Sequence, residues 1–228
     1  MTHVTDFMLD YETMGSAPEG ATIDLAATCF KNDPHNPPTF KELVENGVRA
    51  KFSLIDQKPT GNFPRVFDQG TIEWWKNQSE EARLNLRPTP NDLSVEDGLM
   101  KVLNHLKDQG VDAWQSQGWC RGMSFDFGIL LDQIRQVYKT RETFHLEPCK
   151  FWNQRDVRTA IESTLMVRGM TECPLPAGTL DGFVAHDSIH DCARDILMLI
   201  YSQRYALGLE EAPTEENADP HSVKKKRK

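Results

Sequence analysis

Hydrophobic and polar residues alternate along the first quarter of the chain. An apolar run at residues 7–9 ends in acidic residues, and two further segments, 21–30 and 48–54, place apolar side chains at every second position. This period of two predicts strands. A loop rich in Asn, Asp and Pro at residues 32–38 separates the second strand from the third. Their close spacing predicts an antiparallel meander of three strands.

The apolar period changes to that of helices after residue 70. Helical spacing recurs over residues 71–76, 94–109, 124–138, 156–166 and 185–207, with a capping-box pattern beginning at Ser94. Short strands are expected between the later helices, at residues 113–118 and 146–152. Strands that alternate with helices are typical of parallel pairing. The sequence therefore predicts one α/β domain with a mixed five-stranded sheet, three antiparallel and two parallel strands, flanked by helices.

The last nineteen residues differ from the rest in composition. Residues 210–228 are rich in Glu, Asp and Pro, contain almost no core-forming residues and end in the basic run 224–228. We therefore expect one folded domain over residues 1–209 and a disordered charged tail over residues 210–228. The basic run is either a segment that attracts phosphate groups or a solvated tail without a specific role.

Charge and cysteine content narrow the class of protein. The 228 residues carry 26 Lys and Arg against 34 Asp and Glu, a net charge of −8, so the chain lacks the basic footprint of a duplex-binding protein. Nucleic acid remains a possible substrate if cations neutralise a local carboxylate cluster. Five cysteines without a CxxC pair favour free thiols in a reducing compartment. No apolar run is long enough to span a membrane, so we expect a soluble cytoplasmic protein.

Three acidic sites are candidates for chemistry. Asp10 and Glu12 end the first strand, where residues two apart share a face, and their mutual repulsion would be relieved by a divalent cation. Asp126 lies near the start of a helix between two phenylalanines, and Asp191 lies near the start of the last long helix, shortly after His186. Each site has an alternative reading: a solvated strand end, an acid favoured by a helix dipole, or a helix cap.

Taken in order, the three sites resemble the motifs of the DEDDh superfamily of proofreading-type 3′–5′ exonucleases, which have an RNase-H-like fold. The resemblance spans residues 6 to about 207. Three longer stretches are similar to the exodeoxyribonucleases of T4-like bacteriophages: residues 71–79, 117–126 and 180–191. One departure is Gly122, which stands where many relatives have Asn.

The resemblance implies a set of roles for individual residues. It implies a general base five residues before the last acid, which selects His186 over His190, and a terminal-nucleotide pocket lined by Thr13 and Met14. It implies two divalent ions, Mg²⁺ or Mn²⁺, of the kind that activate water and stabilise both reacting oxygens. At most one of the two adjacent tryptophans, Trp74 or Trp75, is expected to stack on a base while the other packs in the core, and packing of both in the core is the alternative. The implied metal ligands are Asp10, Glu12, Asp126 and Asp191.

The activity that the resemblance implies is removal of nucleotides from the 3′ end of single-stranded DNA, with release of nucleoside 5′-monophosphates. An exoribonuclease is the main alternative, because residues 73–75 also resemble a bacterial group of exoribonucleases with the same motifs. A noncatalytic module that binds nucleic-acid ends is a weaker alternative, since all five motif residues are present. The sequence predicts no oligomeric state.

Overall fold

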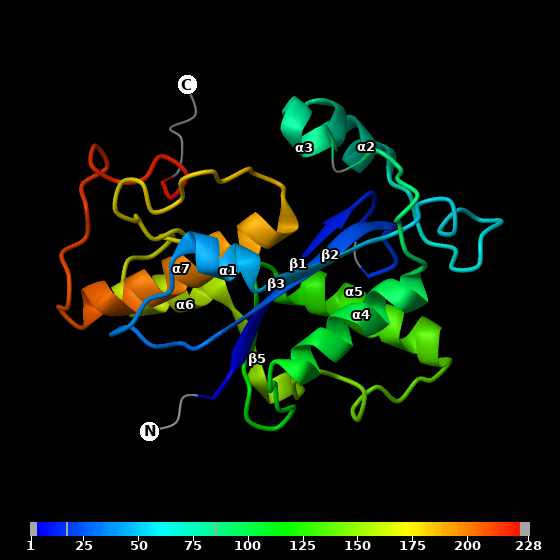
Figure 1. Cartoon of the computed structure of the whole chain (residues 1–228), viewed down its shortest axis with the longest axis horizontal. Helices are drawn as coiled ribbons and strands as arrows, with labels where there is room; N and C mark the ends of the chain where they lie inside the picture. The colour runs from blue at the N-terminus through cyan, green and yellow to red at the C-terminus, as the bar shows by residue number, and fades with distance from the viewer. Residues whose placement is uncertain (1–3, 17, 85, 224–228) are drawn as a thin grey trace.

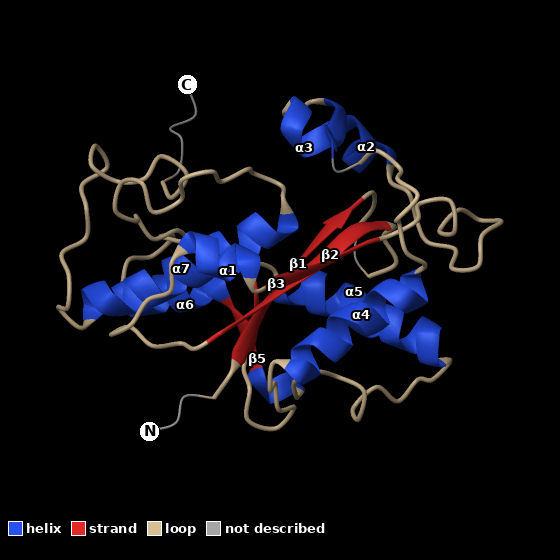
Figure 2. Cartoon of the chain, in the orientation of Figure 1, coloured by secondary structure: helices blue, strands red, loops and turns tan. Residues whose placement is uncertain are grey.

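A computed structural model describes residues 4–16, 18–84 and 86–223, and its centre is a five-stranded sheet (Figures 1 and 2). The strand order is β3-β2-β1-β4-β5. Neighbours in β3-β2-β1 run antiparallel, whereas β4 pairs parallel to β1 and β5 parallel to β4. This confirms the predicted mixed sheet. The strands are β1 (Asp6–Thr13), β2 (Thr22–Phe30), β3 (Gly47–Lys51), β4 (Gly118–Cys120) and β5 (Gln154–Asp156).

Helices cover both faces of the sheet. One face packs against α1, α6 and α7, and the other against α4 and α5, each with its own apolar core. Two short helices, α2 and α3, lie over the end of β1 and the start of β2 (Figure 1), where Trp75 and Ala82 pack against Ile23. None of the helices in the described part of the chain has the length and apolar character that crossing a bilayer requires. The helices are α1 (Phe40–Glu45), α2 (Gln69–Lys76), α3 (Glu80–Leu84), α4 (Val95–Asp108), α5 (Met123–Tyr138), α6 (Val157–Leu165) and α7 (Ser188–Ala206), with a 3-10 turn at Phe151–Asn153.

The alternation of β1 decides where its acidic residues point. Phe7, Leu9 and Tyr11 belong to the core under α4 and α5, whereas Met8 belongs to the core under α7. Because side chains alternate along a strand, Asp10 and Glu12 follow Met8 onto the α7 side. The central strand therefore presents two carboxylates toward the beginning of α7.

The two parallel strands lie later in the chain than the sequence predicts. Strands were expected at residues 113–118 and 146–152, but the structure forms β4 at Gly118–Cys120 and β5 at Gln154–Asp156. Aromatic residues of the two expected segments form a surface cluster instead. Trp114 and Trp152 are exposed there, and their ring centroids are 5.8 Å apart. Strands of three residues give too short a pattern to be located by alternation.

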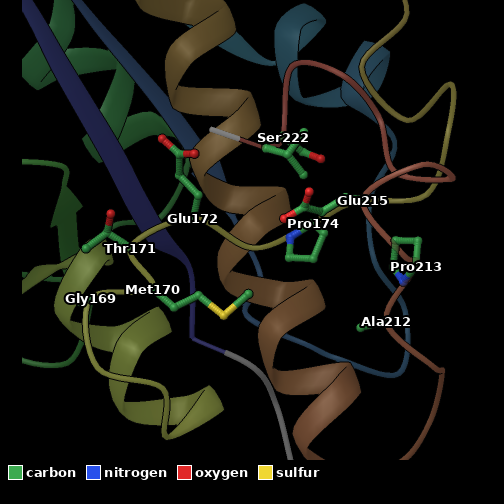
Figure 3. A pocket seen from close by; sticks show the side chains of 10 residues that line it. Gly169, Met170, Thr171, Glu172, Pro174, Ala212, Pro213, Glu215 and Ser222 are labelled. Carbon is green, nitrogen blue, oxygen red and sulfur yellow. The ribbon is translucent and has the colours of Figure 1, made fainter. Parts of the chain in front are cut away.

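The C-terminal segment corrects the prediction of a disordered tail. Residues 210–223 dock on the domain: the Asp219 carboxylate accepts a hydrogen bond from the Leu180 N–H at 2.9 Å, and the Ser222 hydroxyl accepts one from the Leu175 N–H at 2.9 Å. Both polar side chains are buried. A cavity of about 380 Å³ lies between this segment and the loop after α6 (Figure 3). The basic run 224–228 lies outside the described residues.

The docking is achieved by polar side chains that satisfy main-chain groups, so an apolar count could not detect it. We expect Asp219→Ala to lower the melting temperature, because it leaves the buried Leu180 N–H without a partner at a cost of about 1–3 kcal/mol. Glu216→Ala, an exposed charge removal in the same segment, is the matched control. Thermal unfolding monitored by circular dichroism measures both, and equal melting temperatures would contradict the docking.

Candidate active site

The predicted acids are carried to one end of the sheet by three different elements. Asp10 and Glu12 lie in the second half of β1, Asp126 in the first turn of α5, and Asp191 in the first turn of α7. The parallel pairing of β4 with β1 places the start of α5 beside β1. The Tyr11 N–H, between the two β1 acids, donates a hydrogen bond to Asp126 Oδ1 at 3.2 Å.

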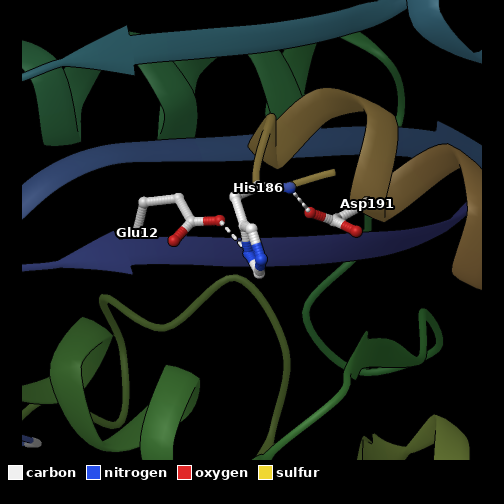
Figure 4. Close-up of side chains that lie close together, drawn as sticks. All are labelled: Glu12, His186 and Asp191. Carbon is white, nitrogen blue, oxygen red and sulfur yellow. Dashed lines mark hydrogen bonds and ion pairs between the residues drawn. The ribbon is translucent and has the colours of Figure 1, made fainter. Parts of the chain in front are cut away.

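Glu12, His186 and Asp191 form a compact cluster in which the side chains converge (Figure 4). His186 Nδ1 lies 3.8 Å from Glu12 Oε1. The main-chain N–H of His186 donates a hydrogen bond to Asp191 Oδ2 at 2.9 Å. One ligand atom from each of the three residues lies within 4.8 Å of those from the other two. Among the described residues, these three form the group that is close enough to bind one cation. Asp10 and Asp126 are not part of that group.

The backbone holds His186 in an unusual conformation. Its φ is +61°, in the left-handed region that non-glycine residues seldom adopt. The next residue, Asp187, caps α7 by accepting a hydrogen bond from the His190 N–H. The His186 side chain is 35% exposed and lies over the Glu12 carboxylate. A strained residue at a cluster of ionisable groups is typical of a functional site.

Burial and mutual repulsion raise the pKa values of the clustered carboxyls. Desolvation, together with the charges of Asp126 and Asp191, holds the pKa of Asp10 well above its ordinary value, and desolvation with the charge of Asp10 does the same for Glu12. Burial raises the pKa of Asp126 to about 7 and that of Asp191 to about 6, although Arg194 opposes the latter. Four acids at one place, two of them buried and two partly buried, are costly without a cation.

Two arginines also reach this cluster, although neither belongs to the three acidic motifs. Arg194 Nη2 lies 2.8 Å from Asp191 Oδ1, and Arg121 binds Asp195 through both Nε and Nη2. Burial acts to raise the pKa of Asp195, but the guanidinium groups of Arg121 and Arg194 hold it below its ordinary value. Asp195 is therefore an ionised partner of arginine. The signal for Asp195 in the sequence was its spacing of four residues from Asp191, because residues i and i+4 share a helix face.

The remaining candidate residues, His190, Trp74 and Trp75, differ in how exposed they are and in what they contact. The His190 ring packs against Phe40, and its Nδ1 accepts a hydrogen bond from the Val184 N–H at 3.0 Å. Trp75 is buried and donates to the Thr13 carbonyl at 2.8 Å, whereas Trp74 is 44% exposed. The Trp74 ring centroid lies 4.9 Å from that of His186.

Thr13 and Met14 connect β1 to the segment that carries α2. Thr13 is buried, and the Met14 N–H and carbonyl are hydrogen-bonded to the Ala21 carbonyl and the Asp68 N–H at 2.7 and 2.8 Å. Asp156, a further acid at the end of β5, caps α6 by accepting a hydrogen bond from the Thr159 N–H at 2.8 Å. The N–H and carbonyl groups of Met14 are therefore both hydrogen-bonded within the protein.

The donor set fits hard divalent cations. Carboxylate oxygens are the ligands that Mg²⁺ and Mn²⁺ prefer. The carboxyls gathered here, those of Asp10, Glu12, Asp126, Asp191 and Asp195, face the guanidinium groups of only Arg121 and Arg194 among their ion-pair partners in the described residues. Asp10, Glu12, Asp126 and Asp191 are the residues that would hold such ions.

This charge imbalance predicts a pH-dependent stability of the metal-free protein. The raised pKa values mean that the folded state binds more protons than the unfolded chain between about pH 4 and 7, so stability falls as pH rises through this window. In EDTA we expect a melting temperature a few degrees higher at about pH 5.5 than at about pH 7.5. Mg²⁺ should raise the melting temperature at the higher pH and have little effect at the lower one. Differential scanning fluorimetry tests this, and a metal-free melting temperature that rises with pH would contradict it.

Comparisons with known proteins place the fold and the family. The mixed five-stranded sheet flanked by helices matches the fold of RNase-H-like exonucleases. Residues 5–198 match the family described as the 3′–5′ exoribonuclease Rv2179c-like domain, and the chain belongs to this family. It is 56% identical over 229 residues to the exodeoxyribonuclease of Enterobacteria phage T4, covering 97% of this chain and 99% of that protein.

Solved structures share the fold at low sequence identity. A complex of E. coli exonuclease I with single-stranded DNA has a TM-score of 0.55 at 12% identity, covering 91% of this chain and 43% of that one. Cell-death related nuclease 4 has a TM-score of 0.54 at 14% identity, covering 90% of this chain and 65% of that one. The chain spans less than half of the exonuclease I chain. Family and fold together make this protein a 3′–5′ exonuclease of the DEDDh-like superfamily.

Proposed function

We propose that this protein removes nucleotides from the 3′ end of single-stranded DNA and releases nucleoside 5′-monophosphates. The observation that carries the proposal is that residues from three motifs distant in sequence meet at one place. Glu12, His186 and Asp191 form a compact group, Asp126 accepts a hydrogen bond from the Tyr11 N–H beside it, and the charge of Asp10 interacts with those of Asp126 and Asp191. The preference for DNA is supported by the phage T4 relative, which is named an exodeoxyribonuclease and matches nearly the whole chain.

The proposed cofactor is a pair of Mg²⁺ or Mn²⁺ ions held by the four carboxylates. Two such ions supply water activation and charge stabilisation at the attacking and leaving oxygens. The chain itself prepares the site in two ways: burial keeps the carboxylates close and poorly solvated, and the Tyr11 N–H fixes the orientation of Asp126. Arg194 offsets part of the negative charge at Asp191.

His186 is the proposed general base. Burial and the charge of Arg194 lower its pKa below the ordinary value, so the imidazole is neutral near pH 7 and able to accept a proton from water. Its half-exposed side chain can reach a water molecule, whereas His190 has its Nδ1 engaged and its ring against Phe40. His186 is also close enough to Glu12 and Asp191 to be a metal ligand. A structure with bound Mn²⁺ distinguishes that role from the role of general base.

Trp74 is the proposed stacking residue for the terminal base. Its ring is exposed beside His186, whereas the neighbouring Trp75 is committed to the Thr13 carbonyl. Aromatic rings bind bases of any sequence by their faces, which suits an enzyme that removes each nucleotide in turn. Thr13 and Met14 are proposed to line the same pocket from the end of β1.

We expect Trp74→Ala to raise the KM for single-stranded DNA about tenfold, because stacking on one base contributes about 1–3 kcal/mol. Trp74→Phe should restore most of the loss. Trp114→Ala is the matched control, since Trp114 is also exposed but lies in the aromatic cluster before β4. Steady-state kinetics measure the effect, and equal KM values for the Trp74 and Trp114 variants would contradict it.

An exoribonuclease is the alternative, since the family description names RNA whereas the phage relative is named for DNA. Contacts to a ribose 2′-hydroxyl would decide between them. The test uses DNA and RNA oligomers of identical sequence, labelled at the 5′ end, in Mg²⁺. We expect a ladder of shortened 5′-labelled products, formed faster from DNA. Faster degradation of RNA would reject the DNA preference, and removal of the 5′ label in the first step would reject the polarity.

A further inference from the structure

A row of charged side chains lies beside the acidic cluster on the neighbouring strands. The β1-β2 register pairs Glu12 with Asp24, and the β2-β3 register pairs Asp24 with Lys51 and Ala26 with Arg49. Residues that are paired or two apart share a face, so Asp24 and Arg49 lie on the α7 side of the sheet, as Glu12 does. Neither residue belongs to the three acidic motifs.

The Arg49 guanidinium joins this row to the beginning of α7. Its Nε lies 3.2 Å from the Ser188 hydroxyl oxygen and 3.6 Å from Asp24 Oδ2, and its Nη2 pairs with the Asp187 carboxylate. Asp24 is buried with 1% of its side chain exposed. One planar group therefore connects two strands with the cap and first residue of α7.

These contacts bear directly on His186, which immediately precedes Asp187 in the chain. His186 occupies a left-handed backbone conformation, and such a conformation persists when its surroundings hold it in place. Arg49 holds the two residues that follow His186, and the Asp191 carboxylate holds the His186 N–H. The orientation of the imidazole over Glu12 thus depends on both attachments.

We propose that Arg49, anchored by Asp24, is a positioning residue that fixes His186 over Glu12. This inference rests on the proposed function, in which His186 acts in catalysis. A fork of several donors fixes the direction of its partners, and a lysine ammonium does not reproduce that geometry. A small displacement of a reacting group can cost up to about 10²-fold in rate.

The test is a double-mutant cycle with Arg49→Lys and His186→Ala in the full chain. The lysine retains a positive charge beside the buried Asp24, which protects the fold, but it cannot bind both Asp187 and Ser188 as Arg49 does. Turnover and KM on single-stranded DNA are measured for the four proteins. Arg65→Lys is the matched control, because Arg65 is a buried arginine that contacts α5 through Asp132 rather than α7.

We expect Arg49→Lys to lower kcat at least about tenfold with KM changed less than about twofold. In the His186→Ala background the same substitution should change kcat less than about twofold, because there is no imidazole left to position. Arg65→Lys should leave kcat within about twofold in both backgrounds.

Three outcomes would overturn the inference. They are an equal loss from Arg49→Lys in both backgrounds, no loss in the wild-type background, and an equal loss from Arg65→Lys. Failure of the proposed function is recognised separately, because the wild-type protein would then not shorten single-stranded DNA from its 3′ end, and failure of the base role is recognised by full activity of His186→Ala. A loss in His186→Ala together with additive effects of Arg49→Lys rejects the positioning role while leaving the function intact.

Discussion

The Asp10→Ala variant is expected to lose at least about 10³-fold in exonuclease rate, because metal-ion catalysis supplies several kcal/mol of transition-state stabilisation. Asp10 lies on the central strand, and its charge interacts with those of Asp126 and Asp191. Its removal therefore weakens a cation site without opening the apolar core. Single-turnover degradation of 5′-labelled single-stranded DNA at saturating Mg²⁺ measures the loss.

A stability measurement separates this loss from misfolding. Desolvation and repulsion raise the pKa of Asp10, so its charge is unfavourable in the metal-free fold, and Asp10→Ala should not lower the melting temperature in EDTA. Asp6→Asn is the matched control: Asp6 is buried on the same strand but accepts a hydrogen bond from the Gln117 N–H, away from the cluster. Asp10→Ala with activity near that of Asp6→Asn would rule out Asp10 as a ligand.

His186→Ala is expected to lower kcat about 10²–10⁴-fold, the usual contribution of one positioned acid–base group. His190→Ala should affect kcat much less and should mainly lower stability, because it leaves the Val184 N–H unpaired and a space beside Phe40. Kinetics and thermal unfolding of both variants make the comparison. Equal impairment of kcat would contradict the choice of base.

The pH profile provides a second signature of His186. A base must be unprotonated to act, so the wild-type rate should rise with pH through the His186 pKa, which burial and Arg194 hold below its ordinary value. The small residual rate of His186→Ala should lack this rise. A limb that persists unchanged in the variant would assign the titration to another group.

The sequence predicted most of the sheet because strands leave local patterns, whereas the acidic set was singled out by its resemblance to the motifs of a known family. The alternation in residues 21–30 matches β2, and the spacing of Asp10 and Glu12 placed them on one face, as β1 shows. The meander followed from short connections. The adjacent tryptophans were expected to face different surroundings, and Trp75 is buried whereas Trp74 is exposed. The catalytic and metal-binding roles of these residues remain predictions.

Other features depend on contacts between distant residues, which no local pattern records. Arg194 and Arg121 reach the cluster only after α7 packs on the sheet, and Arg49 meets Asp187 across 138 positions. The docking of residues 210–223 uses Asp219 as a partner for a main-chain N–H, and a charged residue in an acidic segment gives no sign of burial. The positions of the last two strands were predicted wrongly where exposed aromatic residues such as Trp114 were assigned to a strand.

The most direct test of the proposed metal site is a crystal structure with Mn²⁺ and a nucleoside 5′-monophosphate, in which anomalous scattering locates the ions. We predict two Mn²⁺ ions ligated by Asp10, Glu12, Asp126 and Asp191, with His186 near the phosphate but not bound to metal. A single ion held by Glu12, His186 and Asp191 would contradict both the two-metal site and the general base. Ions bound away from these carboxylates would contradict the site itself.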